Sequence, residues 1–136
     1  MHFLDIDRKH GETLAASTPL ATFHACDLRG IAALRRVAVK DIELLDGAIG
    51  VPIKNAGSDA RHPIEAVEPG YRHERLAFDL DHQLSASQAV ADRMKERGSG
   101  AITMTSSTSW IKSRPRMVAH TTSRAAVVGL TRTLAG

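Results

Sequence analysis

Three side chains near the C-terminal end of the sequence have the types and spacing needed for proton transfer and ligand binding. Ser107 precedes His120 by 13 residues, and Arg124 follows His120 by four, about one turn along a predicted helix. A serine hydroxyl can hold a ligand oxygen, an imidazole changes its charge close to neutral pH, and a guanidinium can bind a ribose hydroxyl or a phosphate. Each also has an ordinary structural explanation: Ser107, like Ser109, as a turn serine, His120 as a partly exposed residue at a helix start and Arg124 as a surface or interface arginine.

Further polar and small residues follow the other three predicted strands. Ligands of parallel α/β sheets bind at the carboxyl ends of the strands, where the strand order reverses. We therefore expect the residues at these four strand ends to share one binding region. They are Asp5, Asp27, Leu28, Asn55, Ala56, Gly57 and Ser107.

Apolar runs alternate with segments of helical periodicity along the whole sequence. The predicted strands cover residues 3–6, 21–26, 49–53 and 101–105. The predicted helices cover residues 7–17, 31–47, 70–97 and 118–134. Strand–helix alternation with short turns favours right-handed βαβ units and a parallel sheet, so the expected architecture is α/β, a three-layer sandwich.

The composition is that of one folded domain. Of 136 residues, 43% are hydrophobic and 24% charged, which excludes a disordered chain, a collagen and a disulfide scaffold. No apolar run approaches the roughly 20 residues of a membrane span, and residues 1–5 do not begin a signal peptide. The lone Cys26 cannot form an internal disulfide, which fits a reducing compartment, so we expect a cytoplasmic protein.

Two other kinds of site are disfavoured by the sequence. Lys112, Arg114 and Arg116 form a basic cluster able to touch phosphate, but no aromatic residues suited to stacking on bases are interleaved with them. The seven histidines lack the short spacings of a metal site. We therefore expect no nucleic-acid partner, no membrane partner and no metal.

The strand-end residues, in their order and spacing, resemble the short-chain dehydrogenase/reductase (SDR) family. The motifs are an acidic residue at Asp5, Asp-Leu at Asp27-Leu28, Asn-Ala-Gly at Asn55-Ala56-Gly57, and Ser107 ahead of a helix that contains Arg124-Ala125-Ala126 and Gly129-Leu130-Thr131. The resemblance covers essentially all 136 residues. It implies a single Rossmann-like domain over residues 1–136, with an incomplete parallel sheet of about four strands.

The resemblance implies an NAD(P)-dependent oxidoreductase that acts on a secondary alcohol or ketone. Asp5 would accept hydrogen bonds from the adenosine ribose, which favours NAD over NADP because a 2′-phosphate would be repelled. Asp27 and Leu28 would flank the adenine, residues 55–57 would pass under the cofactor, and Ser107 would bind the substrate oxygen. The segments 61–65 and 81–83 and the pair Ser109-Trp110 are similar to those of family members that act on sugars or sugar acids.

The sequence departs from the family at the catalytic positions. The family places a tyrosine four residues before a lysine, whose ammonium lowers the phenol pKa; here those positions hold His120 and Arg124. Asp79 stands where the family has an asparagine that holds a proton-relay water, and Lys54 replaces the first residue of Asn-Asn-Ala-Gly. Pro52 removes a ladder donor from the third strand, so we expect that strand to be frayed or at an edge.

The glycine-rich turn with which the family binds the pyrophosphate does not occur in the sequence. We therefore expect a domain truncated at both ends, in which the missing central strand leaves a gap or forces a new pairing. The expected cofactor is NAD rather than NADP, or none because the turn is absent. Two functions stay open: an oxidoreductase with impaired or lost activity, and a non-catalytic remnant that serves as an oligomerisation or interaction module. The helices near 80–97 and 118–134 are expected to pair in a homodimer or higher homo-oligomer.

Overall fold

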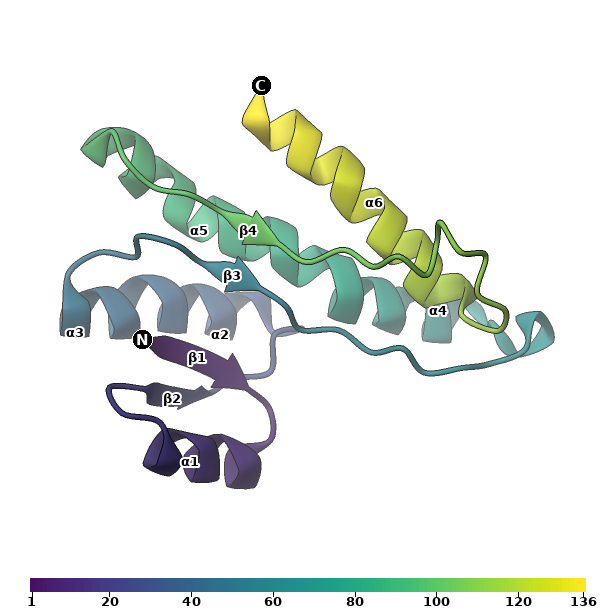
Figure 1. The fold of residues 1–136 in the computed structure, drawn as a ribbon, viewed down its shortest axis with the longest axis horizontal. Coiled ribbons are helices and arrows are strands. Elements are labelled where there is room, and N and C mark those ends of the chain that lie inside the picture. The colour runs from purple at the N-terminus through teal and green to yellow at the C-terminus, as the bar shows by residue number, and fades with distance from the viewer.

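A computed structural model describes the backbone of residues 1–136 and all side chains except those of Ala38, Val39 and Asp46. Strands and helices alternate along the chain as the sequence predicts (Figure 1). Two π-helical stretches, Arg36–Ile42 and Ala77–Asp81, join α2 to α3 and α4 to α5, and a 3₁₀ turn covers Ile64–Ala66. The strands and α-helices are β1 (His2–Asp5), α1 (Arg8–Ser17), β2 (Thr22–Ala25), α2 (Ile31–Arg35), α3 (Glu43–Asp46), β3 (Ile53–Lys54), α4 (Pro69–Leu76), α5 (His82–Arg97), β4 (Thr103–Met104) and α6 (Val118–Ala135).

The ends of the helices follow from local chemistry. The side chain of Asp7 accepts a hydrogen bond from His10 N at 3.0 Å and so caps the start of α1. Gly47 and Gly98 end α3 and α5 at φ angles of 86° and 66°, in a region that favours glycine because it has no Cβ. The predicted helices are therefore confirmed to within about two residues at each end.

The four strands are all parallel but pair two by two. β1 pairs with β2, with Leu4 opposite His24, and β3 pairs with β4, with Lys54 opposite Met104. Among the described residues no ladder joins β1 to β3, so the sheet is divided between them. The third strand was predicted over residues 49–53, and these bounds are wrong: the strand covers only residues 53–54, because Pro52 before them has no N–H to donate. Gly50 O and Pro52 O still accept from Ala101 N and Thr103 N at 3.2 and 3.0 Å.

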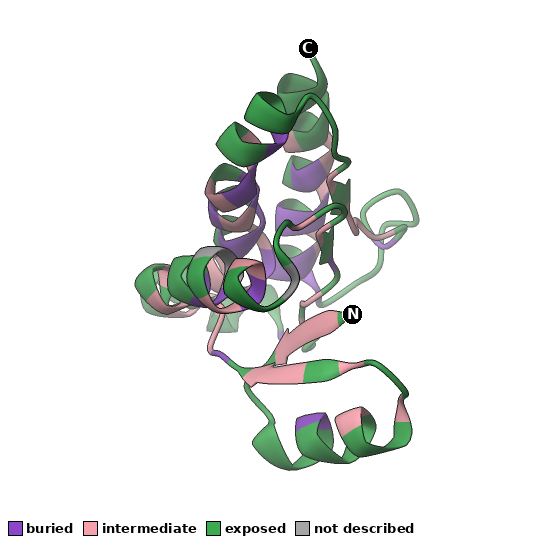
Figure 2. Ribbon diagram, turned by 90° about the vertical axis from the view of Figure 1, so that its left-hand side faces the viewer, coloured by how far each residue is buried: buried purple, intermediate pink, exposed green. Residues whose placement is uncertain are grey.

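Helices cover the two halves of the divided sheet differently. Figure 2 shows α1 on one side of β1 and β2, with α2 on the other side. α5 and α6 cover one face of β3 and β4, and the opposite face carries no helix among the described elements. Ile53 is accordingly 69% exposed. The three layers expected from the sequence are thus complete only over β1 and β2.

A small apolar cluster, formed by Cys26, Leu34, Val37 and Ile42, joins β2 to the helix that follows it. Leu45 was expected on the same helix face, but it is exposed. The reason is the π-helical stretch before it, whose wider turns shift the register of every later residue.

Candidate active site

The carboxyl ends of all four strands point to one end of the molecule, as the arrowheads in Figure 1 show. The loops after β3 and β4 meet there: His62 N donates to Arg116 O at 2.8 Å. Residues predicted from the sequence to act together are therefore gathered at this end, but not all of them face solvent.

Arg124 is the most firmly held of these residues. It is 4% exposed, and its guanidinium donates from Nη1 to Thr105 O at 2.8 Å and from Nη2 to Ala56 O at 2.9 Å. Nη2 also lies 3.4 Å from Oδ1 of Asp79, a residue with no exposed surface. The expectation of a surface or interface arginine is wrong, because its charged group is directed into the protein and satisfied there.

Gly57 lies directly against this guanidinium. A Cβ at position 57 would collide with Nη2 of Arg124. The sequence interpretation gave Gly57 the role of leaving room for a cofactor. In this structure the arginine side chain occupies the space that a Cβ would take, while Gly57 itself is exposed.

Asp79 connects Arg124 to His120 through the backbone of Ser58. Oδ1 of Asp79 accepts from Ser58 N at 3.0 Å, and Ser58 O lies 2.8 Å from Nδ1 of His120. A carbonyl oxygen only accepts, so the neutral imidazole carries its proton on Nδ1 and leaves Nε2 as the acceptor. His120 is 8% exposed, more buried than a helix-start residue was expected to be.

Ser107 and His120 are brought together at one cavity, as the sequence predicts. The cavity has a volume of about 300 Å³. Ser109 N donates to Oγ of Ser107 at 3.1 Å, which fixes the loop after β4 at this point. The residues around the cavity are Asp59, Arg61, Ser107, Thr108, Ser109, Arg114, Met117 and His120.

Further polar side chains are buried beside Asp79, and together they form what we call the polar layer. Lys54 donates from Nζ to Oγ of Ser87 at 2.6 Å, and burial lowers its pKa to about 8. Burial, reinforced by the charges of Arg124 and Lys54, lowers the pKa of His82 to about 4. The polar layer consists of Lys54, Asp79, His82, Gln83, Ser87 and Arg124.

Sequence reasoning missed most of the polar layer. It noted Lys54 only as a departure from a family motif, and it gave no role to Ser58 or Ser87. A signal was present: positions 79, 83 and 87 recur at intervals of four, the spacing of one helix face, and continue into Val90 and Met94. Polar residues at that spacing are more often exposed than buried.

The residues expected to hold the adenosine end of a cofactor lie apart from the polar layer. Asp5 is exposed at the end of β1, and its Oδ1 accepts from Asp7 N at 2.9 Å. Asp27 is paired with Arg29 at 2.7 Å, and Leu28 packs against the apolar cluster. Asn55 is exposed. Asp5 is thus placed where it can accept hydrogen bonds from a ribose, whereas both terminal nitrogens of Arg124 already donate to protein acceptors.

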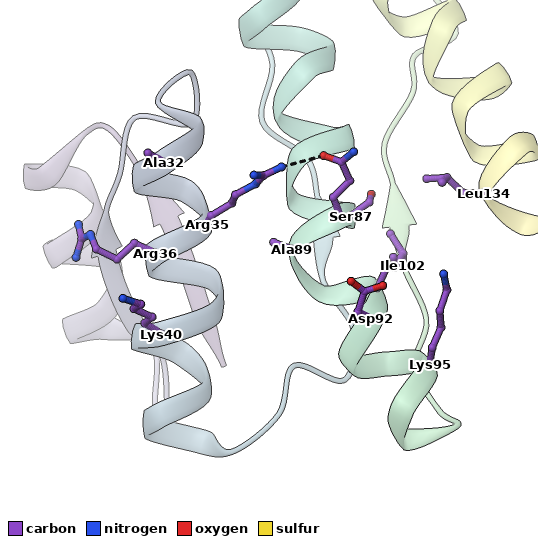
Figure 3. A pocket seen from close by; sticks show the side chains of 12 residues that line it. Ala32, Arg35, Arg36, Lys40, Ser87, Ala89, Asp92, Lys95, Ile102 and Leu134 are labelled. Atoms are coloured by element: carbon purple, nitrogen blue, oxygen red, sulfur yellow. Dashed lines mark hydrogen bonds between the residues drawn. The ribbon is translucent and has the colours of Figure 1, made fainter.

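A larger hollow lies elsewhere, between α2 and α5 (Figure 3). Its volume is about 950 Å³, and Arg35 reaches across it to Oε1 of Gln88 at 3.1 Å. It extends to Ile102 and Leu134, near the amino end of β4 and the end of α6, and none of the predicted site residues borders it. The strand ends therefore remain the candidate site.

Two expected absences can be compared with the described part of the chain. It holds no group of three or more histidine, cysteine, aspartate or glutamate residues that could bind a metal ion. Nor does any helix within it have the length and apolar character needed to cross a membrane.

Comparison with known proteins identifies one matching family and several relatives. Residues 3–136 match the family model described as short chain dehydrogenase. The chain is 36% identical over 137 residues to D-xylose 1-dehydrogenase of Caulobacter vibrioides, covering 98% of this chain and 53% of that protein. It is also 36% identical over 126 residues to a probable galactose dehydrogenase of Rhizobium meliloti, covering 92% of this chain and 49% of that protein. The chain thus spans about half the length of the curated relatives it matches.

Solved structures give the same result for the fold. An NAD⁺-bound xylitol dehydrogenase matches with a TM-score of 0.89 and 26% identity over 98% of this chain and 53% of that one. A gluconate 5-dehydrogenase from Burkholderia cenocepacia, in complex with NADP and tartrate, matches with a TM-score of 0.85 and 29% identity over 98% of this chain and 53% of that one. The incomplete Rossmann-like fold expected from the sequence is confirmed.

Proposed function

Because the chain belongs to the short-chain dehydrogenase family, we propose that it is an NAD-dependent oxidoreductase of a secondary alcohol on a sugar or sugar acid, with strongly impaired turnover. The named relatives act on sugars and a sugar acid, which supports this substrate class. The single observation that carries the impairment is the position of Arg124. Its guanidinium is bonded to Thr105 O, Ala56 O and Asp79, so both of its terminal nitrogens are engaged within the protein.

Asp5 supports NAD over NADP. Its exposed carboxylate at the end of β1 can accept hydrogen bonds from two ribose hydroxyls and would repel a 2′-phosphate. Asp27 would stand beside the adenine with its charge already balanced by Arg29, which lowers the pKa of that carboxyl.

His120 is the group that would exchange the substrate proton. With Nδ1 committed to Ser58 O, its Nε2 can accept a proton from a hydroxyl held by Ser107, which borders the same cavity. The imidazole is shorter than a phenol, so the proton is transferred over a less favourable distance than in a family member with tyrosine.

The test combines cofactor binding with turnover. We expect NADH to bind saturably in a fluorescence titration with ADP-ribose as the competitor, and Asp5→Ala to weaken that binding about tenfold. We expect NADH formation from D-xylose, D-galactose or D-gluconate to be barely above background. The double variant His120→Tyr/Arg124→Lys is not expected to restore it. Rapid turnover by the unmodified chain would contradict the impairment, and NADPH binding as tightly as NADH would contradict the cofactor preference.

A second candidate is a non-catalytic module that dimerises through α5 and α6. Val118 and Leu134 of α6 and Leu84 of α5 are exposed apolar side chains on these two helices, which supports a surface covered by a second copy. Light scattering at increasing concentration tests this function. A dimer without NADH binding favours the module, whereas a monomer at all concentrations excludes it.

A further inference from the structure

The cavity that contains Ser107 and His120 carries more positive than negative charge. Arg61 enters it from the loop after β3, and Arg114 enters from the loop after β4. Asp59 is the one acidic residue among the described residues that line it. Two guanidinium groups against one carboxylate leave a net charge of one positive unit, which matches a monoanion.

Neither arginine is occupied by the protein. Within the described side chains, no ion pair or hydrogen bond involves the guanidinium of Arg61 or that of Arg114, and both residues are exposed. This distinguishes them from Arg124, whose two terminal nitrogens both donate to protein acceptors, and from Arg29, which is paired with Asp27 and Glu74. A free guanidinium pair is suited to a carboxylate, which it can bind through parallel hydrogen bonds.

The same cavity has buried polar groups for neutral oxygens. Ser109 is 8% exposed, and its Oγ has no hydrogen-bond partner among the described residues. Buried hydroxyls without a partner are uncommon in folded proteins. Together with Oγ of Ser107 and Nε2 of His120, this hydroxyl provides three sites for the oxygens of a polyhydroxy ligand.

The loop that carries Arg114 is held in an unusual backbone conformation. Ser113 and Arg116, on either side of Arg114-Pro115, have φ angles of 49° and 62°, which non-glycine residues seldom adopt. The hydrogen bond from His62 N to Arg116 O fixes this turn to the loop of Arg61, and Tyr71 OH in turn lies 2.8 Å from Nδ1 of His62. The surrounding contacts thus hold the two arginine-bearing loops together.

From these observations we propose that the cavity binds a small polyhydroxy monocarboxylate, with its carboxylate on Arg61 and Arg114 and its hydroxyls on Ser107, Ser109 and His120. The cavity volume of about 300 Å³ suits a single small molecule. The inference rests on the proposed family function because it names the ligand class of the same site. Of the two substrate classes proposed above, the sugar acid is therefore expected to bind more tightly than the neutral sugar.

Trp110 provides a direct measurement of binding. It is the only tryptophan in the chain and follows Ser109 in the loop after β4. The probes are sodium D-gluconate and D-sorbitol, which have the same six-carbon chain and differ by a carboxylate in place of a hydroxymethyl group. Both are titrated at constant ionic strength set with sodium chloride.

We expect D-gluconate to change Trp110 fluorescence saturably and to bind at least tenfold more tightly than D-sorbitol. Arg61→Gln and Arg114→Gln should each weaken D-gluconate binding about tenfold and leave D-sorbitol unchanged. Lys112→Gln is the matched control, since Lys112 is an exposed cation of the same loop that does not border the cavity. Circular dichroism verifies that each variant is folded.

Equal binding of the two probes, no saturation by D-gluconate, or a loss in Lys112→Gln as large as in Arg114→Gln would overturn the proposal. Inorganic phosphate binding more tightly than D-gluconate would also overturn it, because the site would then select a phosphate. NADH titration of the same samples separates the two hypotheses. Loss of the D-gluconate preference with NADH binding intact rejects only the ligand class, and D-gluconate binding without NADH binding rejects only the cofactor.

Discussion

The apolar cluster beside β2 and the polar layer beside β3 and β4 are both buried, but different forces hold them together. In the apolar cluster, Cys26, Leu34, Val37 and Ile42 contribute by leaving water, and their mutual orientation matters little. In the polar layer, Asp79 and Arg124 are stable only because specific acceptors and donors surround each charge. The polar layer is therefore expected to be more sensitive to single substitutions.

The comparison also shows where the chain retains unsatisfied groups. The second carboxylate oxygen of Asp79, both ring nitrogens of His82 and Oε1 of Gln83 are buried without hydrogen-bond partners among the described residues. Each such group costs about 1–3 kcal/mol. These four atoms belong to three residues that lie close together in the sequence. Their burial without partners lowers stability, so a contribution to stability alone does not explain it.

The largest effect is expected from separating the buried charges. Arg124→Met leaves Asp79 charged and without its ion partner, and the free energy of unfolding should fall by about 3–5 kcal/mol in urea titrations. Asp79→Asn/Arg124→Met removes both charges and should recover part of that loss. Arg8→Met, which breaks the exposed pair of Arg8 with Glu12, is the control and should cost less than about 1 kcal/mol. Similar losses in the two single variants would remove the distinction between buried and exposed pairs.

The apolar cluster is tested by Leu34→Ala. Leu34 is 3% exposed, so its truncation should lower the free energy of unfolding by about 2–5 kcal/mol through lost burial and a residual cavity. Leu44→Ala, on the same helical segment but 83% exposed, should change it by less than about 0.5 kcal/mol. A small loss at Leu34 would mean that the cluster contributes little to holding β1 and β2 in place.

His82 makes the polar layer sensitive to acid. Its pKa is about 4 in the folded chain and 6.5 without burial, so between these pH values the unfolded chain binds a proton that the folded chain does not. Stability should therefore fall as the pH is lowered from 6.5 to 4, by at most roughly 3 kcal/mol.

The check is thermal unfolding across this pH range. His82→Gln should flatten the decline, whereas His73→Gln, at an exposed position of α4, should leave it unchanged. An identical slope in the native chain and in His82→Gln would show that groups other than His82 determine the acid response.

The smallest expected effect is a gain. Lys54 is buried with one hydrogen-bond partner, Ser87, and replacing it by methionine should raise the free energy of unfolding by about 1 kcal/mol at pH 7. Lys54 is charged in both the folded and the unfolded chain below pH 8. Between pH 8 and 10.5 it loses its proton in the folded chain but keeps it in the unfolded chain. The advantage of Lys54→Met should therefore shrink over that range. Lys9→Met, at an exposed position of α1, controls for the added methionine.

The elements of the fold could be predicted because their signals are local. Asp7, Gly47 and Gly98 mark helix ends in the sequence itself, and the strands stand out as short apolar runs. The pairing of these strands depends on residues far apart in the sequence, so local signals do not predict it. The division between β1 and β3 appears only in the assembled sheet. The length of β3 was overestimated because the residues around Pro52 are apolar and favour a strand, whereas the missing N–H of Pro52 interrupts the ladder.

The candidate site was predictable in its location but not in its orientation. Ser107 and His120 meet at one cavity as their spacing indicates. The inward direction of Arg124 could not be predicted, because it depends on two carbonyl oxygens and one carboxylate that lie 19, 68 and 45 residues away. A long side chain can form hydrogen bonds with such distant partners only after the tertiary structure has brought them close.

The π-helical stretch Ala77–Asp81 makes the number of residues in this long helix matter as much as their identity. A stretch of this kind holds one residue more than an α-helical turn, and removing that residue would rotate everything beyond it by about 100° relative to what precedes it. Asp79 could then remain beside Arg124 only if Ser87 turned away from Lys54, or the reverse. Deleting a single alanine, Ala77, is thus expected to dismantle contacts that most substitutions at the same position would leave in place. The length of the π-helical stretch thus sets the rotation of α5 relative to α4 about the helix axis.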